Sequence, residues 1–222
     1  MGGLIPLGDA SRRPMRFAVV TLSIVLLNVY FFLKELLYGD AYVFAWSAIP
    51  IRIMHGHHLV TLLTSMFMHG SWMHIIGNMI YLWAFGRAME DTMGSFRFLG
   101  FYLTGGVVAM MVQILGDPTS RVPTLGASGA IAAVMGAFLV TYPTDRIRTV
   151  LFFFIFIHVT YIPAALLIGF WFLMQVLNLG AVAAVKTGGV AYLAHVGGFL
   201  FGVVTGRLLA NPRRMAYRSN WS

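Results

Sequence analysis

The chain has 222 residues, of which 59% are hydrophobic and only 10% charged, with a formal charge of +8 and no cysteine. A soluble domain has about 45–50% apolar and about 25% charged residues, so this composition is typical of a polytopic membrane protein. The absence of cysteine excludes disulfides, thiolate metal sites and a thiol nucleophile. The basic residues are spread over the connections between apolar runs, which argues against a nucleic-acid partner and favours a protein surrounded by membrane lipids.

Six apolar runs predict six transmembrane helices, and therefore an all-α polytopic membrane protein. They cover about residues 17–37, 73–89, 96–115, 128–142, 163–180 and 190–209. The first run is too long for the apolar part of a signal peptide, so it is predicted to be a span. We expect residues 151–162 to be a buried or interfacial approach to the fifth span.

The predicted domain is a six-helix unit at residues 15–209, between cytoplasmic tails at 1–14 and 210–222. Within these tails, residues 1–11 and 211–222 are expected to be flexible. A cell membrane, the inner or plasma membrane of a bacterium or archaeon, is the expected location, because no targeting peptide is evident in the short first tail.

The distribution of basic residues supports an even number of spans with both tails on the cytoplasmic side. Six spans place eleven basic residues inside and four outside. The inner set is Arg12, Arg13, Arg16, Arg87, Arg97, Arg146, Arg148, Arg207, Arg213, Arg214 and Arg218, and the outer set is Lys34, Arg52, Arg121 and Lys186.

The fourth run is too short to cross a bilayer. At 1.5 Å per residue it reaches about 22 Å, against a hydrocarbon core of about 30 Å. A helix that starts at Ser128 therefore begins below one membrane surface. A loop at that depth is tolerated where protein covers it or where it lines a wet cavity, so we expect a water-filled depression near Ser128.

Ser128 lies in the sequence Gly126-Ala127-Ser128-Gly129-Ala130, at a loop-to-helix junction. The flanking glycines permit a sharp turn and a close approach of a substrate carbonyl. The free N–H groups of a helix start are ready donors to an oxyanion, so Ser128 is a candidate nucleophile. The alternative is a serine that only caps the helix, which is common.

His195 is the candidate general base for Ser128. It follows Ala194, which with Gly198, Gly202 and Gly206 forms a ridge of small residues at four-residue intervals. Such a ridge allows close helix contact, as a Ser–His hydrogen bond between helices requires. The alternative is a packing motif with an incidental histidine, although ionisable groups inside a membrane are rare.

A third group of polar residues lies between His69 and Asn78. His74 and Asn78 are four residues apart on one helix face, and both can donate hydrogen bonds to an oxyanion beside the Ser128 amide. His69 is expected in the incoming loop, in a supporting role. A metal site is the alternative, because His55, His57, His58, His69 and His74 cluster in sequence.

No carboxylate or cysteine is spaced to complete such a metal site, so we expect no metal and no cofactor. The seven acidic residues are also predicted to lie away from His195. A Ser128–His195 dyad is therefore favoured over a Ser–His–Asp triad.

These motifs together resemble the rhomboid family of intramembrane serine proteases, over about residues 15–209. The resemblance rests on H-x4-H-x3-N from His69, the GASGA sequence around Ser128, and the AHxxGxxxG pattern that includes Gly198 and Gly202. It implies that Ser128 is the nucleophile, His195 the base, and His74, Asn78 and the Ser128 amide the oxyanion donors. It also implies that single-pass transmembrane proteins are the substrates and are cut near the outer surface, at small residues and locally unwound backbone. The oligomeric state is not implied.

The sequence departs from the family in two places. Many bacterial members carry a Trp-Arg pair in the first outer loop, where this chain has His58-Leu59-Val60-Thr61. Some members have a tyrosine one turn after the serine, stacked on the histidine, where this chain has Ala132. His195 is therefore expected either to contact another aromatic side chain or to be less restrained.

Two other classes of function remain as alternatives. A non-proteolytic relative that binds transmembrane helices is expected to have lost the serine or the histidine, and both are present here. A transporter or channel is disfavoured, because no inverted repeat with paired broken helices is visible.

Overall fold

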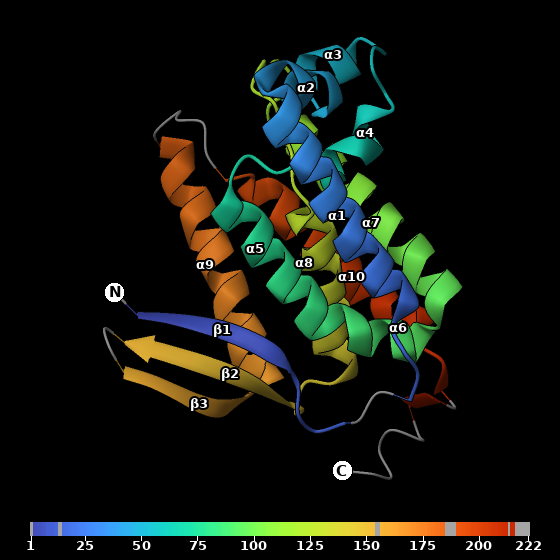
Figure 1. Ribbon diagram of the computed structural model, residues 1–222, viewed down its shortest axis with the longest axis vertical. Helices are drawn as coiled ribbons and strands as arrows, with labels where there is room; N and C mark the ends of the chain where they lie inside the picture. The colour runs from blue at the N-terminus through green and yellow to red at the C-terminus, as the bar shows by residue number, and fades with distance from the viewer. Residues whose placement is uncertain (1, 13–14, 154–155, 185–189, 213, 216–222) are drawn as a thin grey trace.

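The computed structural model describes residues 2–12, 15–153, 156–184, 190–212 and 214–215. Long helices lie side by side in a bundle, with short helices at one end and a small sheet at the other (Figure 1). The elements in chain order are β1 (Gly2–Asp9), α1 (Val19–Tyr38), α2 (Asp40–Trp46), α3 (Pro50–Met54), α4 (Thr61–Thr64), the 3₁₀ helix η1 (Ser65–Phe67), α5 (Trp72–Tyr81), the π-helical η2 (Leu82–Gly86), α6 (Arg87–Met93), α7 (Ser95–Gly116), α8 (Ser128–Thr141), β2 (Arg146–Phe153), β3 (Phe156–Pro163), α9 (Ala164–Ala184) and α10 (Tyr192–Leu209).

The predicted all-α membrane class is confirmed by the long helices. Helices fall on all six predicted runs, and α5, η2 and α6 follow one another without a break over the second run. Among the described residues, α1, α7 and α10 are long and apolar enough to cross a membrane, whereas Ser128–Thr141 and Ala164–Gly180 are shorter apolar helices. The count of six spans stays a prediction.

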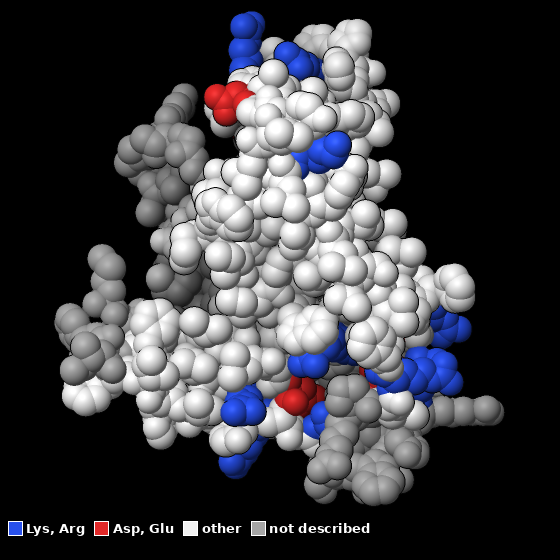
Figure 2. Space-filling model, in the orientation of Figure 1, with Lys and Arg blue, Asp and Glu red and all other residues white. Residues whose placement is uncertain are grey.

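Charged side chains lie at the two ends of the bundle, and the visible face between them is almost free of charge (Figure 2). We call one end the basic end, because the start of α1, the turn between α6 and α7, strand β2 and the end of α10 carry basic residues there. The described members of this set are Arg12, Arg16, Arg87, Arg97, Arg146, Arg148, Arg207 and Arg214. Arg13, Lys186, Arg213 and Arg218, which also entered the charge argument, lie outside the described residues.

Two residues of α6 bind the start of α1 and the segment that follows α10, at the basic end. Glu90 accepts hydrogen bonds from the backbone N–H groups of Val20 (2.9 Å) and Thr21 (2.7 Å), and so caps the first turn of α1. The carbonyl oxygen of Asp91 accepts a hydrogen bond of 3.1 Å from Arg214, which follows α10. The start of α1 and the end of α10 therefore both lie next to α6, at the same end of the bundle. An even number of membrane passes requires that they lie on the same side.

The described residues of 151–162, expected to be a buried or interfacial approach to the fifth span, form strands. Most side chains of β3 are exposed, so the buried alternative is wrong there, and the interfacial one stays a prediction. Strands β2 and β3 form an antiparallel hairpin there, from the Arg146–Pro163 pair to the Phe153–Phe156 pair. The segment is rich in β-branched and aromatic residues, which favour strands. Exposure also alternates along β2, since Arg146 and Arg148 are exposed while Ile147 and Thr149 are buried. This alternation precedes the apolar run, and it indicates a strand where the hydrophobicity of residues 151–162 alone does not.

The prediction of a flexible first tail is also wrong for most of its length. Residues Gly2–Asp9 form β1, which pairs antiparallel with β2 and completes a sheet of order β1-β2-β3. The side chain of Arg12 is paired with Asp145, next to this sheet. In the second tail, the N–H of Asn211 donates to Thr92 O (3.2 Å), and residues 216–222 lie outside the described part.

Helices α8 and α10 make the closest contact in the bundle, through the predicted ridge of small residues. A Cβ atom on Gly198 would overlap the carbonyl oxygen of Gly129, and one on Gly202 would overlap that of Ala133. A Cβ atom on Gly206 would overlap the side chain of Ala137. The backbones of α8 and α10 therefore touch along three turns, at a separation that only glycine on α10 permits.

We predict that Gly202→Ala lowers the free energy of unfolding by about 1–3 kcal/mol, the usual cost of overpacking, because the added methyl group meets backbone that cannot move aside. Titration with denaturing detergent measures this change. Gly169→Ala on α9 is the matched control, since nothing lies within 4 Å of its added Cβ. An equal effect of the two substitutions would contradict the prediction.

Candidate active site

Ser128 is the first residue of α8, and its side chain does not cap that helix. The N-cap position is Ala127, and no side chain bonds there. The alternative interpretation of Ser128 as a capping residue is therefore wrong. Because α8 has 14 residues and ends at the basic end, Ser128 lies about 21 Å from that end, short of the opposite side of a hydrocarbon core of about 30 Å.

The side chains of Ser128 and His195 meet across the α8–α10 contact. Ser128 Oγ lies 2.7 Å from His195 Nε2, within hydrogen-bonding distance. His195 is 8% exposed, and it lies in the first turn of α10, next to the small residue Ala194. The close packing of α8 and α10 therefore also brings the hydroxyl of Ser128 within hydrogen-bonding distance of the imidazole of His195.

The other ring nitrogen of His195 has a partner that the sequence did not indicate. His195 Nδ1 lies 2.8 Å from the side-chain oxygen of Gln175 on α9. The ring of Trp171, one turn earlier on α9, lies 5.8 Å from the His195 ring between centroids, and the ring of Tyr192 lies 6.3 Å from it. Of the two possibilities left by Ala132, contact with another aromatic side chain is the one observed.

His69, His74 and Asn78 lie together on the other side of Ser128. The Asn78 amide Nδ2 lies 2.9 Å from His69 Nε2; an amide nitrogen only donates, so His69 Nε2 accepts. The rings of His69 and His74 are 5.1 Å apart in an edge-on arrangement. His69 is thus in the incoming loop, as expected, and its ring bonds to Asn78.

Glu35 of α1 is a second residue that the sequence did not indicate. Its carboxylate accepts hydrogen bonds of 2.8 and 3.1 Å from the backbone N–H of His69, and its side chain is buried. An acceptor from α1 therefore holds the loop that leads into α5. Glu35 and His69 are 34 residues apart, and no sequence motif joins them, so the sequence could not predict this contact.

Gly126 separates the His74 ring from Ser128. Its φ of +124° is one that L side chains rarely adopt. A Cβ atom built there would lie 2.8 Å from His74 Nε2 and 3.7 Å from Ser128 Oγ. The imidazole of His74 and the hydroxyl of Ser128 therefore face the same small space, which the missing side chain of Gly126 leaves open.

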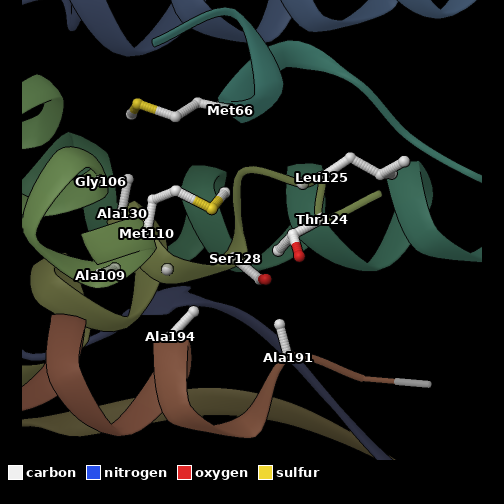
Figure 3. A pocket seen from close by; sticks show the side chains of 12 residues that line it. Met66, Gly106, Ala109, Met110, Thr124, Leu125, Ser128, Ala130, Ala191 and Ala194 are labelled. Atoms are coloured by element: carbon white, nitrogen blue, oxygen red, sulfur yellow. The ribbon is translucent and has the colours of Figure 1, made fainter. Parts of the chain in front are cut away.

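A cavity of about 10 Å³ lies beside Ser128 (Figure 3), with room for roughly one water molecule. Most of its lining residues are glycine or alanine from the α8 junction, α7 and α10, together with Met66, Met110, Thr124 and Leu125. A small cavity therefore lies where the short fourth run predicts a water-filled depression, and its filling with water stays a prediction. Within the described ranges, no three His, Asp or Glu side chains are arranged to hold a metal ion.

The sequence of the chain is similar to those of known proteins of one family. The sequence model of the Rhomboid domain matches residues 56–212. The mitochondrial Rhomboid protein 1 of Saccharomyces cerevisiae is 29% identical over 73% of this chain and 47% of its own length. The mitochondrial presenilin-associated rhomboid-like protein of Homo sapiens is 32% identical over 64% of this chain and 36% of its own length. The chain thus matches less than half the length of these relatives.

These relatives overturn the expectation of a bacterial or archaeal cell membrane, because their names place them in mitochondria. The multi-pass membrane character is supported. The expectation relied on the absence of an evident targeting peptide from the short first tail. The distribution of basic residues determines only orientation across a bilayer and does not identify which membrane the protein occupies.

We predict that Gly126→Ala lowers the free energy of unfolding by about 1–3 kcal/mol, because alanine is strained at this φ and its methyl group meets the His74 ring. Denaturing-detergent titration of the purified protein measures the change. The control is Gly70→Ala in the neighbouring loop, where φ is not positive and the nearest atom to an added Cβ is 3.9 Å away. Unchanged stability of the Gly126 variant would show that this junction is not strained.

Proposed function

The chain belongs to the rhomboid family, and we propose that it is an intramembrane serine endopeptidase with Ser128 as nucleophile and His195 as general base. Intramembrane proteolysis is the activity of the family, whose proteases act on transmembrane substrates in the bilayer. The observation that carries the assignment for this chain is the 2.7 Å contact between Ser128 Oγ and His195 Nε2, made by two helices inside an apolar bundle.

In the proposed reaction, His195 Nε2 takes the proton of Ser128 as Oγ attacks the scissile carbonyl carbon. A tetrahedral intermediate forms, and His195 then gives the proton to the leaving amine. Water hydrolyses the resulting acyl-enzyme with His195 again acting as base.

Three donors are proposed for the oxyanion. The backbone N–H of Ser128 is one of the first N–H groups of α8, which lack intrahelical acceptors. His74 faces the same space as Ser128, and the Asn78 amide has a second hydrogen besides the one directed to His69. Donors fixed before the reaction stabilise the developing charge most in a site that excludes water.

The cavity beside Ser128 supports a preference for small residues at the cleavage site. Glycine and alanine line the space next to Ser128, so a substrate side chain there has room for little more than a methyl or hydroxymethyl group. A transmembrane helix must unwind to present its carbonyl groups, and glycine lowers the cost of unwinding. The proposed substrates are therefore single-pass transmembrane proteins with small residues near the end of the span that faces Ser128.

We predict that Ser128→Ala and His195→Ala each lower cleavage of a transmembrane reporter by at least roughly a thousandfold, because each removes one half of the reacting pair. Both variants should also fail to react with a fluorophosphonate probe. His158→Ala is the control, since this histidine is exposed on β3. Retained activity in either variant would disprove the assignment, and a folded wild type that neither cleaves nor reacts would favour a helix-binding relative without protease activity.

We further predict that His74→Ala and Asn78→Ala each lower kcat by roughly 10²–10³-fold, the usual effect of losing an oxyanion donor, with little change in KM. Steady-state cleavage of the same reporter in proteoliposomes measures both constants. His57→Ala, which removes an exposed histidine of the first loop, should leave them unchanged. A rise in KM without a fall in kcat would assign these side chains to substrate binding instead.

A further inference from the structure

Gln175 is a buried polar side chain in the middle of an apolar helix. It is 9% exposed, and it is one of the two amide side chains of α9, with Asn178. Its Nε2 lies 3.1 Å from the carbonyl oxygen of Trp171, and its Oε1 lies 2.8 Å from His195 Nδ1. A polar group in such a position is costly unless its hydrogen bonds are made, and here both ends of the amide are bonded.

These contacts determine which nitrogen of His195 carries the proton. The Trp171 carbonyl can only accept, so the Gln175 amide must direct its NH₂ group there. Its oxygen then faces His195, and because that oxygen can only accept, Nδ1 must be the donor. A neutral imidazole with its proton on Nδ1 presents a lone pair on Nε2, the atom 2.7 Å from Ser128 Oγ.

We propose that Gln175 is a positioning residue that holds His195 with its proton on Nδ1, so that Nε2 is free to take the proton of Ser128. The proposal rests on the proposed function and extends it from a dyad to a hydrogen-bonded relay of Trp171 carbonyl, Gln175, His195 and Ser128. Gln175 occupies the place that a carboxylate takes in a Ser–His–Asp triad.

A neutral orienting group suits an apolar interior. A carboxylate beside His195 would be a buried charge before the reaction begins, when the imidazole is neutral, and an unpaired buried charge is expensive. The amide oxygen of Gln175 offers the same acceptor without a charge. It also faces the N–H that becomes part of the imidazolium during the reaction, where a fixed dipole is favourable.

Helix α9 restrains the imidazole in a second way. Trp171 and Gln175 are four residues apart, so both lie on the face of α9 directed at His195. Beside them, the rings of Phe172 and Phe199 stack with centroids 4.1 Å apart, which ties α9 to α10 one turn beyond His195. The orientation of His195 thus depends on α9, although neither reacting side chain belongs to that helix.

The tautomer of His195 tests the proposal without any reference to catalysis. In protein labelled with ¹⁵N-histidine, the nitrogen shifts distinguish a proton on Nδ1 from one on Nε2, and the His195→Ala spectrum assigns the signals. We expect Nδ1–H in wild type and in the control Asn178→Leu, and a shift toward Nε2–H in Gln175→Leu. The same tautomer in wild type and Gln175→Leu would overturn the proposal.

The rate of reaction with a fluorophosphonate gives the chemical consequence. Gln175→Leu should slow labelling of Ser128 roughly 10- to 100-fold, part of the roughly 10²–10⁴-fold that a general base contributes. Gln175→Glu restores the acceptor and should regain most of this rate. Because a carboxylate stabilises the imidazolium, the acid limb of its pH–rate profile should move to higher pH, which a purely structural role would not produce.

The outcomes separate this proposal from the proposed function. Labelling that depends on His195 but is equally fast in Gln175→Leu and wild type would reject the role of Gln175 and leave the protease assignment standing. The opposite result is a His195 tautomer that differs between wild type and Gln175→Leu, in a wild-type protein that does not react with the fluorophosphonate. That result would support the positioning role of Gln175 and reject the protease assignment. If Gln175→Leu does not fold, the test uses Gln175→Glu alone. A pH–rate profile of labelling that is the same in Gln175→Glu and in wild type would then overturn the proposal.

Discussion

The arrangement of the site depends on the direct backbone contact between α8 and α10. Gly198, Gly202 and Gly206 place α10 against the backbone of α8, at a distance that any side chain on these positions would increase. Inside a bilayer, association of helices relies on such close packing, because lipid tails are as apolar as the side chains they replace. The same contact fixes how far Ser128 lies from His195. The glycines of α10 therefore determine both the close packing of the two helices and the distance between the two reacting side chains.

Three side chains near Ser128 bond to partners from different parts of the chain. Gln175 of α9 bonds to His195 of α10, Asn78 of α5 bonds to His69 of the incoming loop, and Glu35 of α1 binds the backbone of that loop. Unpaired polar groups would be costly in this environment, so these contacts restrict the helices to arrangements that satisfy all of them at once. The conformation of the site is thus a property of the whole bundle.

The sequence predicted the helices and the meeting of Ser128 with His195, because hydropathy and the four-residue spacing of small residues are local patterns with direct structural consequences. It failed for the sheet, because a continuous apolar run such as residues 151–162 does not by itself distinguish a strand from a buried helix. It also failed for Gln175 and Glu35, since nothing local to a glutamine on α9 or a glutamate on α1 reveals which neighbour it faces. Pairings between separate helices arise from the packed bundle, and one sequence does not specify them by spacing alone.

We infer that the α8–α10 contact makes Ser128 a reactive nucleophile. Peptide mass spectrometry after reaction with a fluorophosphonate tests it most directly, in wild type and in Gly202→Ala kept under conditions where both remain folded. We expect a single adduct, on Ser128, that forms much more slowly in Gly202→Ala because the serine and the imidazole are no longer held together. An adduct on another serine, or equal reactivity of Ser128 in the two proteins, would contradict it.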